Sequence, residues 1–252
     1  MEENEKKIRL KIKRQDGPDA APYWEDFEIP WRPSHNVISV LREISKNPVN
    51  AAGKKVRPVV YDANCMEEVC GACSMIINGE VTQACSTLVD DLEQPIRLEP
   101  MTRFPLVRDL MVDRDKMFAA LRKIKAWVDI DGSYDVGTTG PRVSPGEWER
   151  NYTFARCMTC GCCMEVCPQF HQGSDFVGPA PIAQAHRMVH HPTGKYHAEE
   201  RLHSLMTKGG IADCGNAQNC VQVCPKDIPL TDAIADISRQ TTIQWLKDIF
   251  LK

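Results

Sequence analysis

Cysteines are the residues of this chain whose type and spacing could do chemistry. Twelve of them occur among 252 residues. The tightest run is Cys157-x2-Cys160-x2-Cys163-x3-Cys167, followed by Pro168. Thiolates at this spacing converge on one soft metal centre, and bacterial ferredoxins bind their clusters with the same spacing. Because such a cluster moves electrons one at a time, the run predicts a redox function.

A separate set of four cysteines, the first set, lies nearer the start of the chain. Cys65-x4-Cys70-x2-Cys73, followed by Cys85, has the spacing of plant-type [2Fe–2S] ferredoxins. Small or turn-forming residues in this run let the backbone aim N–H groups at the sulfur atoms, and such hydrogen bonds raise a reduction potential. Four cysteines also suit a structural Zn²⁺ site. The x4 spacing and the neighbouring strands favour the iron–sulfur interpretation.

A third run is the bacterial-ferredoxin pattern with one member missing. It reads Cys214-x5-Cys220-x3-Cys224, and the position that should carry another cysteine is Ala217. Alanine has no donor atom, so an iron opposite it would lack a protein ligand. Asp213 is an alternative ligand, although it would have to bend back past Cys214.

The two bacterial-type runs are expected to exchange ligands. In two-cluster ferredoxins the fourth cysteine of each run binds the cluster of the other run. This exchange predicts a [4Fe–4S] site with four ligands, the second set: Cys157, Cys160, Cys163 and Cys224. It predicts a [3Fe–4S] site with three ligands, the third set: Cys167, Cys214 and Cys220. Cys162 is left over, and we expect a buried small side chain that points away from the cluster.

Composition limits the class of protein. The net charge of −3 and the lack of a long basic run argue against nucleic-acid binding. The first residues are charged and predict no secretory signal, and no apolar stretch approaches the ~20 residues of a membrane span. We therefore expect a reducing compartment, where clustered cysteines are metal ligands rather than disulfides.

Residues 1–110 predict a small α+β sheet domain. Asn36 is placed to cap a helix with an apolar stripe, and Asn78-Gly79 predicts a tight hairpin. Alternating apolar residues predict further strands near residues 8–12, 27–29 and 96–98. Strands with one packed helix are typical of an α+β fold.

Residues 111–252 predict a helical domain interrupted by cysteine loops. Apolar residues from Met117 to Val128 follow helical spacing, with Asp113 as the expected cap, and residues 132–146 predict a loop. Further helices are expected at 182–189, 199–206, 231–237 and 242–250.

The order of the three cysteine sets resembles the iron–sulfur subunit of succinate dehydrogenase and fumarate reductase. The matching stretches after the first set are CMTCGCCMEVCP at 157–168 and DCGNAQNCVQVCPKDIPL at 213–230. The resemblance covers nearly the whole chain. It implies a β-grasp, plant-type ferredoxin-like domain followed by an all-α, bacterial-ferredoxin-like domain. It also implies that an FAD-containing partner subunit oxidises succinate, so no catalytic residue is expected on this chain.

The same resemblance implies an order of partners. The [2Fe–2S] site would face the flavoprotein, and the [3Fe–4S] site would lie nearest a membrane-anchor cytochrome b subunit and its quinone. The chain would be peripheral on the cytoplasmic face of the cell membrane. Ubiquinone-linked members are similar to one another in a tryptophan shortly after the first cysteine of the third site and a histidine right after the next. Here the residues are Pro168 to His171 and Gly215, which resembles the menaquinone-linked type with a two-haem anchor.

Other polar and aromatic residues give weaker indications. Trp148, Tyr152 and Phe154 precede Cys157 and are expected to pack around its cluster. His171 is expected to be a solvated loop residue, although it could line an approach to quinone or haem. The remaining histidines lack a fixed ligand spacing and predict a surface: His186, His190, His191, His197 and His203.

Three other functions remain open on sequence. A quinol:fumarate reductase would use the same subunit in the reverse direction. A zinc-binding structural module would use the same cysteines without a redox role. A free-standing ferredoxin-like carrier would also hold clusters, although 252 residues is large for one.

Overall fold

The computed structural model describes residues 6–128, 137 and 139–251. The chain divides into two compact units. The first unit comprises residues 1–114 and 158–165, and the second comprises residues 115–157 and 166–252. The eight-residue segment 158–165 therefore belongs with the N-terminal part of the chain, although it carries cysteines of the bacterial-type run.

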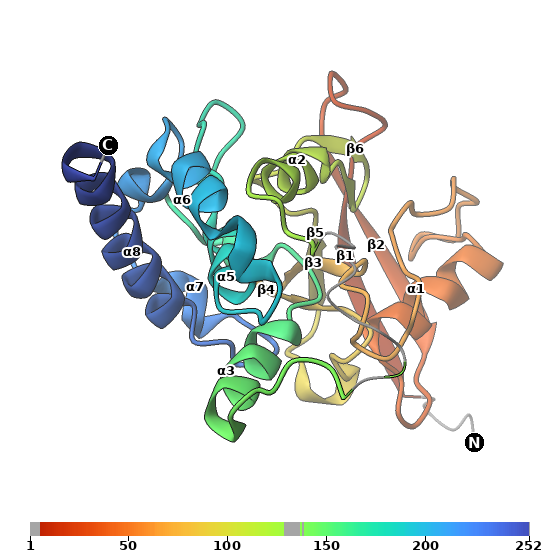
Figure 1. Cartoon of the computed structure of the whole chain (residues 1–252). Coiled ribbons are helices and arrows are strands. Elements are labelled where there is room, and N and C mark those ends of the chain that lie inside the picture. The colour runs from red at the N-terminus through yellow and green to blue at the C-terminus, as the bar shows by residue number, and fades with distance from the viewer. Residues whose placement is uncertain (1–5, 129–136, 138, 252) are drawn as a thin grey trace. The chain divides into compact units, whose positions relative to one another are not determined.

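A mixed five-stranded sheet forms the frame of the first unit (Figure 1). Its strands are β1 (Lys7–Arg14), β2 (Tyr23–Pro30), β3 (Ser74–Ile77), β4 (Glu80–Gln83) and β5 (Ile96–Glu99). Their order across the sheet is β2-β1-β5-β3-β4, with β1 and β5 parallel and the other pairs antiparallel. Together with helix α1 (Val37–Lys46), this order is the β-grasp arrangement and confirms the predicted α+β class.

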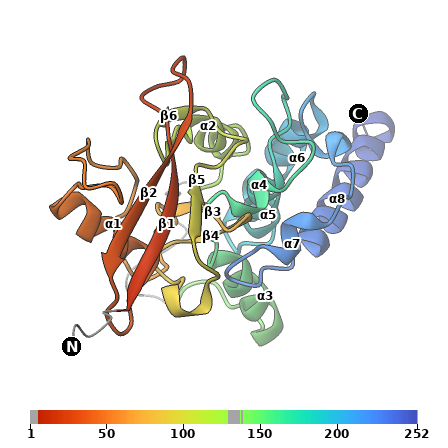
Figure 2. The ribbon, with the colours of Figure 1, turned by 180° about the vertical axis from the view of Figure 1, so that it is seen from behind.

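Short elements complete the first unit. They are the 3₁₀ turn η1 (Val89–Asp91), strands β6 (Leu106–Arg108) and β7 (Met111–Val112), and helix α4 (Cys162–Glu165). The view from behind shows the long strands β1 and β2 side by side (Figure 2).

The spacing of apolar residues in the sequence predicts the core of the first unit. Ile8, Leu10 and Ile12 of β1 are buried, and so is the apolar stripe of α1. The Asn36 side chain accepts a hydrogen bond from Ser39 N–H at 2.8 Å, and Ser39 Oγ accepts one from Asn36 N–H at 2.9 Å. The predicted strand, helix and cap are thus confirmed.

The predicted hairpin joins β3 to β4. Asn78 and Gly79 have φ values of 50° and 91°. Two central residues with positive φ match the twist of antiparallel strands, which explains the Asn-Gly pair. The hairpin leads from Cys73, just before β3, back toward Cys85.

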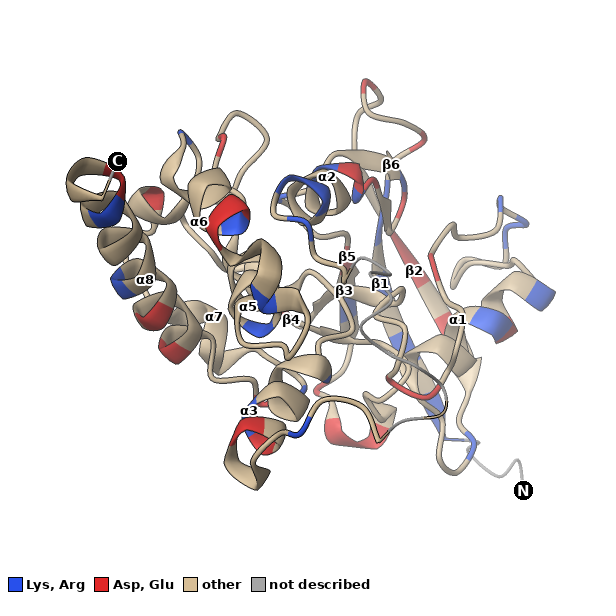
Figure 3. Ribbon diagram, in the orientation of Figure 1, with Lys and Arg blue, Asp and Glu red and all other residues tan. Residues whose placement is uncertain are grey.

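Helices make up the second unit, whose described residues contain no strand. The helices are α2 (Asp115–Lys123), α3 (Pro145–Ala155), α5 (Pro179–Val189), α6 (Ala198–Met206), α7 (Asn219–Gln222) and α8 (Leu230–Phe250). The 3₁₀ turns are η2 (Gly194–His197) and η3 (Ile211–Asp213). Helix α8 packs against α5 and α6. Acidic and basic residues are interspersed along the described helices (Figure 3).

Three helix predictions need correction. The segments 231–237 and 242–250 form one continuous helix, α8, because the Thr241 and Thr242 hydroxyls bond to carbonyls of the preceding turn instead of interrupting it. Helix α2 begins at Asp115, so Asp113 does not directly precede it. The helix ends at Lys123, because Lys125 adopts a φ of 49°.

Helix α3 was missed by the periodicity. It starts at Pro145, inside the loop predicted at 132–146, so the observed loop ends at Ser144. Ser144 and Glu147 form a capping box around Pro145. The Ser-x-x-Glu spacing, which is typical of a capping box, was the sequence signal that could have predicted the start of this helix. Residues 132–136 and 138 of the predicted loop lie outside the described residues.

Among the described residues, no helix is both long enough and apolar enough to cross a membrane.

Candidate metal centres

The first cysteine set lies in the loop that leads into β3. Cys65 Sγ accepts hydrogen bonds from the N–H groups of Glu67, Val69 and Cys70 at 3.3–3.4 Å. Cys70 Sγ accepts from Cys65 N–H at 3.5 Å and Ala72 N–H at 3.4 Å. Five backbone donors therefore surround two sulfur atoms, which is the environment that stabilises negative charge on a thiolate or cluster sulfur.

Left-handed backbone allows this loop to wrap so tightly. Met66, Glu68 and Gly71 have φ values of 61°, 53° and 68°. These turns direct successive N–H groups inward, as in an anion-binding backbone nest. The hydrogen bond from Glu67 N–H is the largest influence that lowers the pKa of Cys65 to about 7.

The other two members of the first set are buried. Burial is the main cause that raises the pKa of Cys73 to about 12, and the adjacent Cys85 thiol raises it further. Ala84 N–H donates to Cys73 O at 3.2 Å, which fixes the approach of the Cys85 segment. The structure thus brings the four cysteines together with donors aimed at sulfur. This donor set fits a [2Fe–2S] cluster better than zinc, because the backbone donors stabilise added charge.

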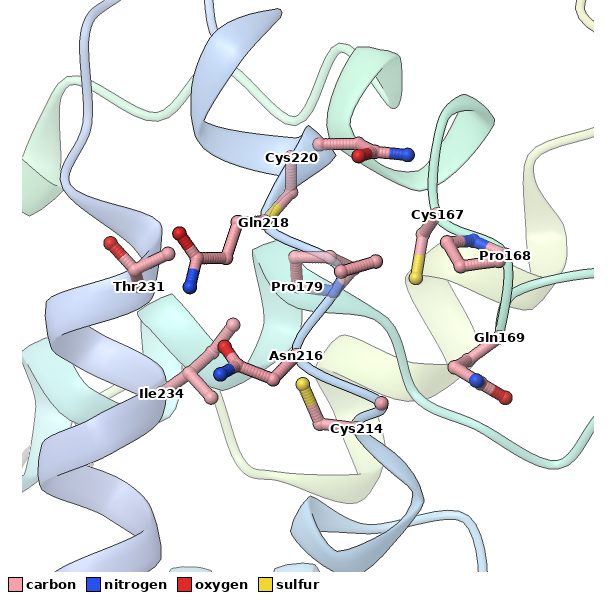
Figure 4. A pocket seen from close by; sticks show the side chains of 13 residues that line it. Cys167, Pro168, Gln169, Pro179, Cys214, Asn216, Gln218, Cys220, Thr231 and Ile234 are labelled. Carbon is pink, nitrogen blue, oxygen red and sulfur yellow. The ribbon is translucent and has the colours of Figure 1, made fainter.

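The three cysteines of the third set line one pocket in the second unit (Figure 4). Burial raises the pKa of Cys220, and the neighbouring Cys167 and Cys214 add to that rise. Helix α8 closes one side of the pocket with Thr231 and Ile234. The sequence grouping is therefore reproduced in space.

Ala217 also lines this pocket, where the complete pattern would have its fourth thiolate. It lies between Asn216 and Gln218, whose φ values are 53° and 63°. Asp213, the alternative ligand, accepts a hydrogen bond from Gly209 N–H at 2.9 Å and is not among the described residues that line the pocket. Three thiolates beside an alanine methyl group fit a cluster with three irons.

The cysteines of the second set are divided between the two units, with two in each. Cys160 and Cys163 belong to the first unit, on either side of the start of α4. Cys157 follows α3 and Cys224 follows α7 in the second unit. Cys224 Sγ accepts a hydrogen bond from Ile228 N–H at 3.5 Å. All twelve cysteines are thiols rather than halves of disulfides.

Glu165 anchors α4, a role that no motif or spacing in the sequence predicts. Its carboxylate is buried and accepts hydrogen bonds from Thr102 N–H at 2.8 Å, Thr102 Oγ1–H at 2.6 Å and Arg103 N–H at 3.0 Å. These three bonds tie the segment that carries Cys163 to the loop after β5.

Cys162 is fully buried, in agreement with the prediction, but its surroundings are polar. Its Sγ accepts from Gln83 Nε2 at 3.5 Å and lies 3.8 Å from Ser74 Oγ. Cys160 forms a hydrogen bond with the Cys162 thiol, and this bond is the main cause that raises the pKa of Cys160. Gln83 Oε1 also lies 3.5 Å from Cys73 Sγ, so one amide connects the two cysteine segments of the first unit.

The surface prediction is wrong for His186. Its ring is buried against Phe154, with centroids 4.5 Å apart, because α3 and α5 pack together. His190 Nε2 lies 2.8 Å from Asp236 Oδ2, and His186 Nε2 lies 3.4 Å from the same atom. Asp236 also accepts hydrogen bonds from Arg239 and Gln240, so several protein donors already share its carboxylate. His171 is exposed, as expected.

The three aromatic residues before Cys157 differ in burial. Phe154 is buried, whereas Trp148 and Tyr152 are more than half exposed. Their rings stack on each other at 5.1 Å along α3. They are one helical turn apart, so both lie on the same outer face.

Comparisons with known proteins agree with this geometry. A family model described as a 2Fe-2S iron-sulfur cluster binding domain matches residues 9–119, which include the whole first set. A model described as a 4Fe-4S dicluster domain matches residues 153–228, which include the second and third sets. The "Succinate dehydrogenase iron-sulfur subunit" of Bacillus subtilis (strain 168) is 55% identical over 98% of this chain and 97% of its own length. This chain belongs to the succinate dehydrogenase iron–sulfur subunit family.

More distant relatives also match nearly the whole length of this chain. The "Fumarate reductase iron-sulfur subunit" of Escherichia coli O6:H1 is 27% identical over 98% of this chain and 96% of its own length. A solved chain from the "Mycobacterium smegmatis Sdh1 complex in the apo form" superposes with a TM-score of 0.76 at 20% identity, covering 98% of each chain. This superposition shows that the two chains share their fold.

Proposed function

We propose that this chain is the electron-transfer subunit of a membrane-bound succinate dehydrogenase. One observation carries the proposal: 55% identity over 98% of the chain to a succinate dehydrogenase iron–sulfur subunit. The eleven cysteines of the three sets support it, because they supply thiolates for three clusters in the order that the family has. The dicarboxylate site belongs to a partner subunit.

We assign ligands to each cluster by set. The first set holds [2Fe–2S], the second holds [4Fe–4S], and the third holds [3Fe–4S]. Bound there, the clusters supply one-electron carriers between a two-electron dehydrogenation and a quinone. We propose a domain of residues 1–110 for the first site and a domain of residues 111–252 for the other two, and the two family-model matches support this division. Segment 158–165, with Cys160 and Cys163, nevertheless belongs to the first compact unit.

The chain's own residues shape these sites. Backbone N–H groups around Cys65 and Cys70 stabilise charge on sulfur, and burial of Cys73, Cys85 and Cys220 excludes water. Ala217 withholds a fourth ligand from the third site. The protein thereby sets how many irons each site holds and how readily each accepts an electron.

The partners follow from the family. An FAD-containing flavoprotein subunit delivers electrons, and a membrane-anchor cytochrome b subunit receives them beside a quinone. We place the chain on the cytoplasmic face of the cell membrane, held there by the anchor. Pro168 after Cys167 and Gly215 after Cys214 support menaquinone and a two-haem anchor, because the tryptophan and histidine of the ubiquinone-linked type are missing.

A quinol:fumarate reductase subunit is the second candidate. The 27% identity to a fumarate reductase subunit over 98% of the chain supports it, but the 55% identity to a succinate dehydrogenase subunit favours the forward direction. The direction depends on cluster potentials and on the quinone.

The proposed function is tested in the complex purified from membranes under anaerobic conditions. Succinate should reduce the clusters of this chain, as followed by EPR, and a menaquinone analogue should reoxidise them. Succinate oxidation should exceed fumarate reduction under matched conditions. Clusters that stay oxidised after succinate is added, in a complex that contains the flavoprotein, would overturn the proposal.

A further inference from the structure

Arg114 places a permanent positive charge beside the first cysteine loop. Its Nη1 donates to Gly71 O at 2.5 Å and its Nη2 donates to Ala72 O at 2.7 Å. These carbonyls belong to the two residues between Cys70 and Cys73. The guanidinium thus holds the loop through both branches of its planar fork.

Thiols of two cysteine sets share the surroundings of this cation. The electrostatic neighbours that favour the charged form of Arg114 are Asp62, Cys160, Cys162 and Cys73, although its burial lowers its pKa. Arginine stays protonated in proteins despite such a shift. Cys73 belongs to the first set and Cys160 to the second, so a single cation acts on both.

One donor of Arg114 lacks an acceptor in the part of the chain that the structure describes. Its Nε atom is buried and has no hydrogen-bond partner among the described residues. A buried donor without an acceptor is unfavourable, so such groups call for an explanation. Sulfur acceptors of a bound cluster would supply a partner for this N–H group.

A buried cation has a definite effect on redox equilibria. Reduction adds one negative charge to a cluster, and a positive charge held nearby in a medium of low dielectric constant stabilises the reduced form. Hydrogen bonds to cluster or cysteine sulfur act in the same direction. Exposed charges have little influence because solvent and salt screen them.

We propose that Arg114 raises the reduction potential of the [2Fe–2S] cluster through its fixed charge beside the 70–73 loop. This role rests on the proposed function, because it requires the clusters at the assigned cysteines. Arg114 is a positioning residue: it acts on the clusters through their environment and is not one of their ligands.

Substitutions separate the charge from the loop contacts. Arg114→Met removes the charge and keeps an unbranched side chain. Arg114→Lys keeps the charge but loses the two-branched grip on Gly71 and Ala72. Asp62→Asn removes the opposing charge and should move the potential the other way. Arg97→Met is the control, because Arg97 is an exposed arginine of β5 in the same unit.

The test is an EPR-monitored redox titration of the [2Fe–2S] signal in the intact complex. At the wild-type midpoint, Arg114→Met should raise the oxidised-to-reduced ratio about tenfold, equivalent to a fall of about 59 mV for one electron. Arg114→Lys should keep most of the wild-type midpoint, Asp62→Asn should raise it, and Arg97→Met should leave it unchanged.

The outcomes are distinguishable. An unshifted midpoint in Arg114→Met with a full [2Fe–2S] signal overturns the role of Arg114 and leaves the proposed function intact. If Arg114→Met loses the cluster, the Asp62→Asn complex decides: a raised midpoint supports the role and an unchanged midpoint overturns it. A wild-type complex without the signal overturns both the role and the proposed function.

Discussion

Gly71 lies directly against the backbone of Cys160. A β-carbon built on Gly71 would come 2.6 Å from Cys160 Cα and 2.8 Å from Met158 O. Ser74 Oγ lies within hydrogen-bond distance of both Gly71 O and Cys160 O, at 3.0 and 2.9 Å. The first cysteine loop and the start of the bacterial-type run are therefore in contact, with no side chain between the two backbones. Under the proposed ligand assignment, this contact joins the loop of the [2Fe–2S] site to a segment that carries ligands of the [4Fe–4S] site.

Gly71→Ala should loosen that contact and destabilise the [2Fe–2S] site. The new methyl group would collide with Cys160, and φ at this position is +68°. Strain at positive φ is about 1–2 kcal/mol and overpacking adds typically about 1–3 kcal/mol. The melting temperature of the complex and the amplitude of the [2Fe–2S] EPR signal measure the effect.

Gly79→Ala is the matched control for Gly71→Ala. Gly79 has a φ of +91° but nothing within 4 Å of the added carbon. The variant should therefore lose only about 1–2 kcal/mol of stability, from strain at positive φ, and should keep the cluster. Equal loss of the EPR signal in both variants would contradict the importance of the contact.

Glu165→Gln should weaken the second set. An amide cannot accept all the hydrogen bonds that the carboxylate accepts from Thr102 and Arg103. Each buried donor left unpaired lowers the free energy of unfolding by about 1–3 kcal/mol. Because Glu165 holds the helix that carries Cys163, we expect iron content to fall by about the four irons of one cluster. Glu80→Gln, at an exposed position of β4, should retain its iron; a Glu165→Gln complex with full iron content would rule out the anchoring role.

Ala217→Cys should convert the third site toward [4Fe–4S]. The added thiol would face the pocket that Cys167, Cys214 and Cys220 already line. The EPR signal of the oxidised [3Fe–4S] cluster should then diminish and iron content should rise by about one per chain. Ala217→Val, which adds similar bulk without a donor, should keep the three-iron signal. Persistence of that signal at full strength in Ala217→Cys would argue against the assigned ligand set.

His186 should make the fold more sensitive to acid. Burial is the main cause that lowers its pKa from 6.5 to about 4, and the nearby His190 and Arg150 contribute, although Asp236 opposes the shift. The unfolded chain binds a proton below about pH 6.5 and the folded chain only below about pH 4. The free energy of unfolding therefore falls as the pH is lowered through this window, by roughly 3 kcal/mol in total. Burial alone would raise the pKa of Asp236, but hydrogen bonds from His190, Arg239 and Gln240 hold it at about 2, so this carboxylate does not titrate in the window.

The sensitivity is measured as the change in melting temperature between pH 7 and pH 5. His186→Gln should reduce that change, and His171→Gln, at an exposed loop position, should leave it as in wild type. Clusters lose iron in acid in every variant, so the comparison between variants isolates His186. An identical pH dependence in wild type and His186→Gln would refute the prediction.

The sequence predicted those parts of the structure that have local causes. The alternation at Ile8, Leu10 and Ile12 and the cap at Asn36 depend on residues a few positions apart, and both are confirmed. Cysteine spacing is equally local, because one metal centre limits the length of chain between its ligands. The pocket shared by Cys167, Cys214 and Cys220 needed one more assumption, the exchange of ligands between runs.

Other parts depend on contacts between distant segments. Arg114 donates to the carbonyls of Gly71 and Ala72. Every residue has a carbonyl, so the types of these residues do not reveal the contact in the sequence. His186 is buried because α3 and α5 meet around Phe154, which the pattern of its own helix does not reveal. The continuity of α8 was missed for a different reason: polar residues near Thr241 resemble a break, but their hydroxyls bond within the helix.

Iron analysis of the complex, purified anaerobically, tests the central claim most directly. Three clusters at the assigned cysteines require about nine irons for each copy of this chain, after correction for any haem iron in the anchor. Acid-labile sulfide should be present at about ten per chain. A value of about four irons or fewer, or zinc in place of iron, would contradict the account.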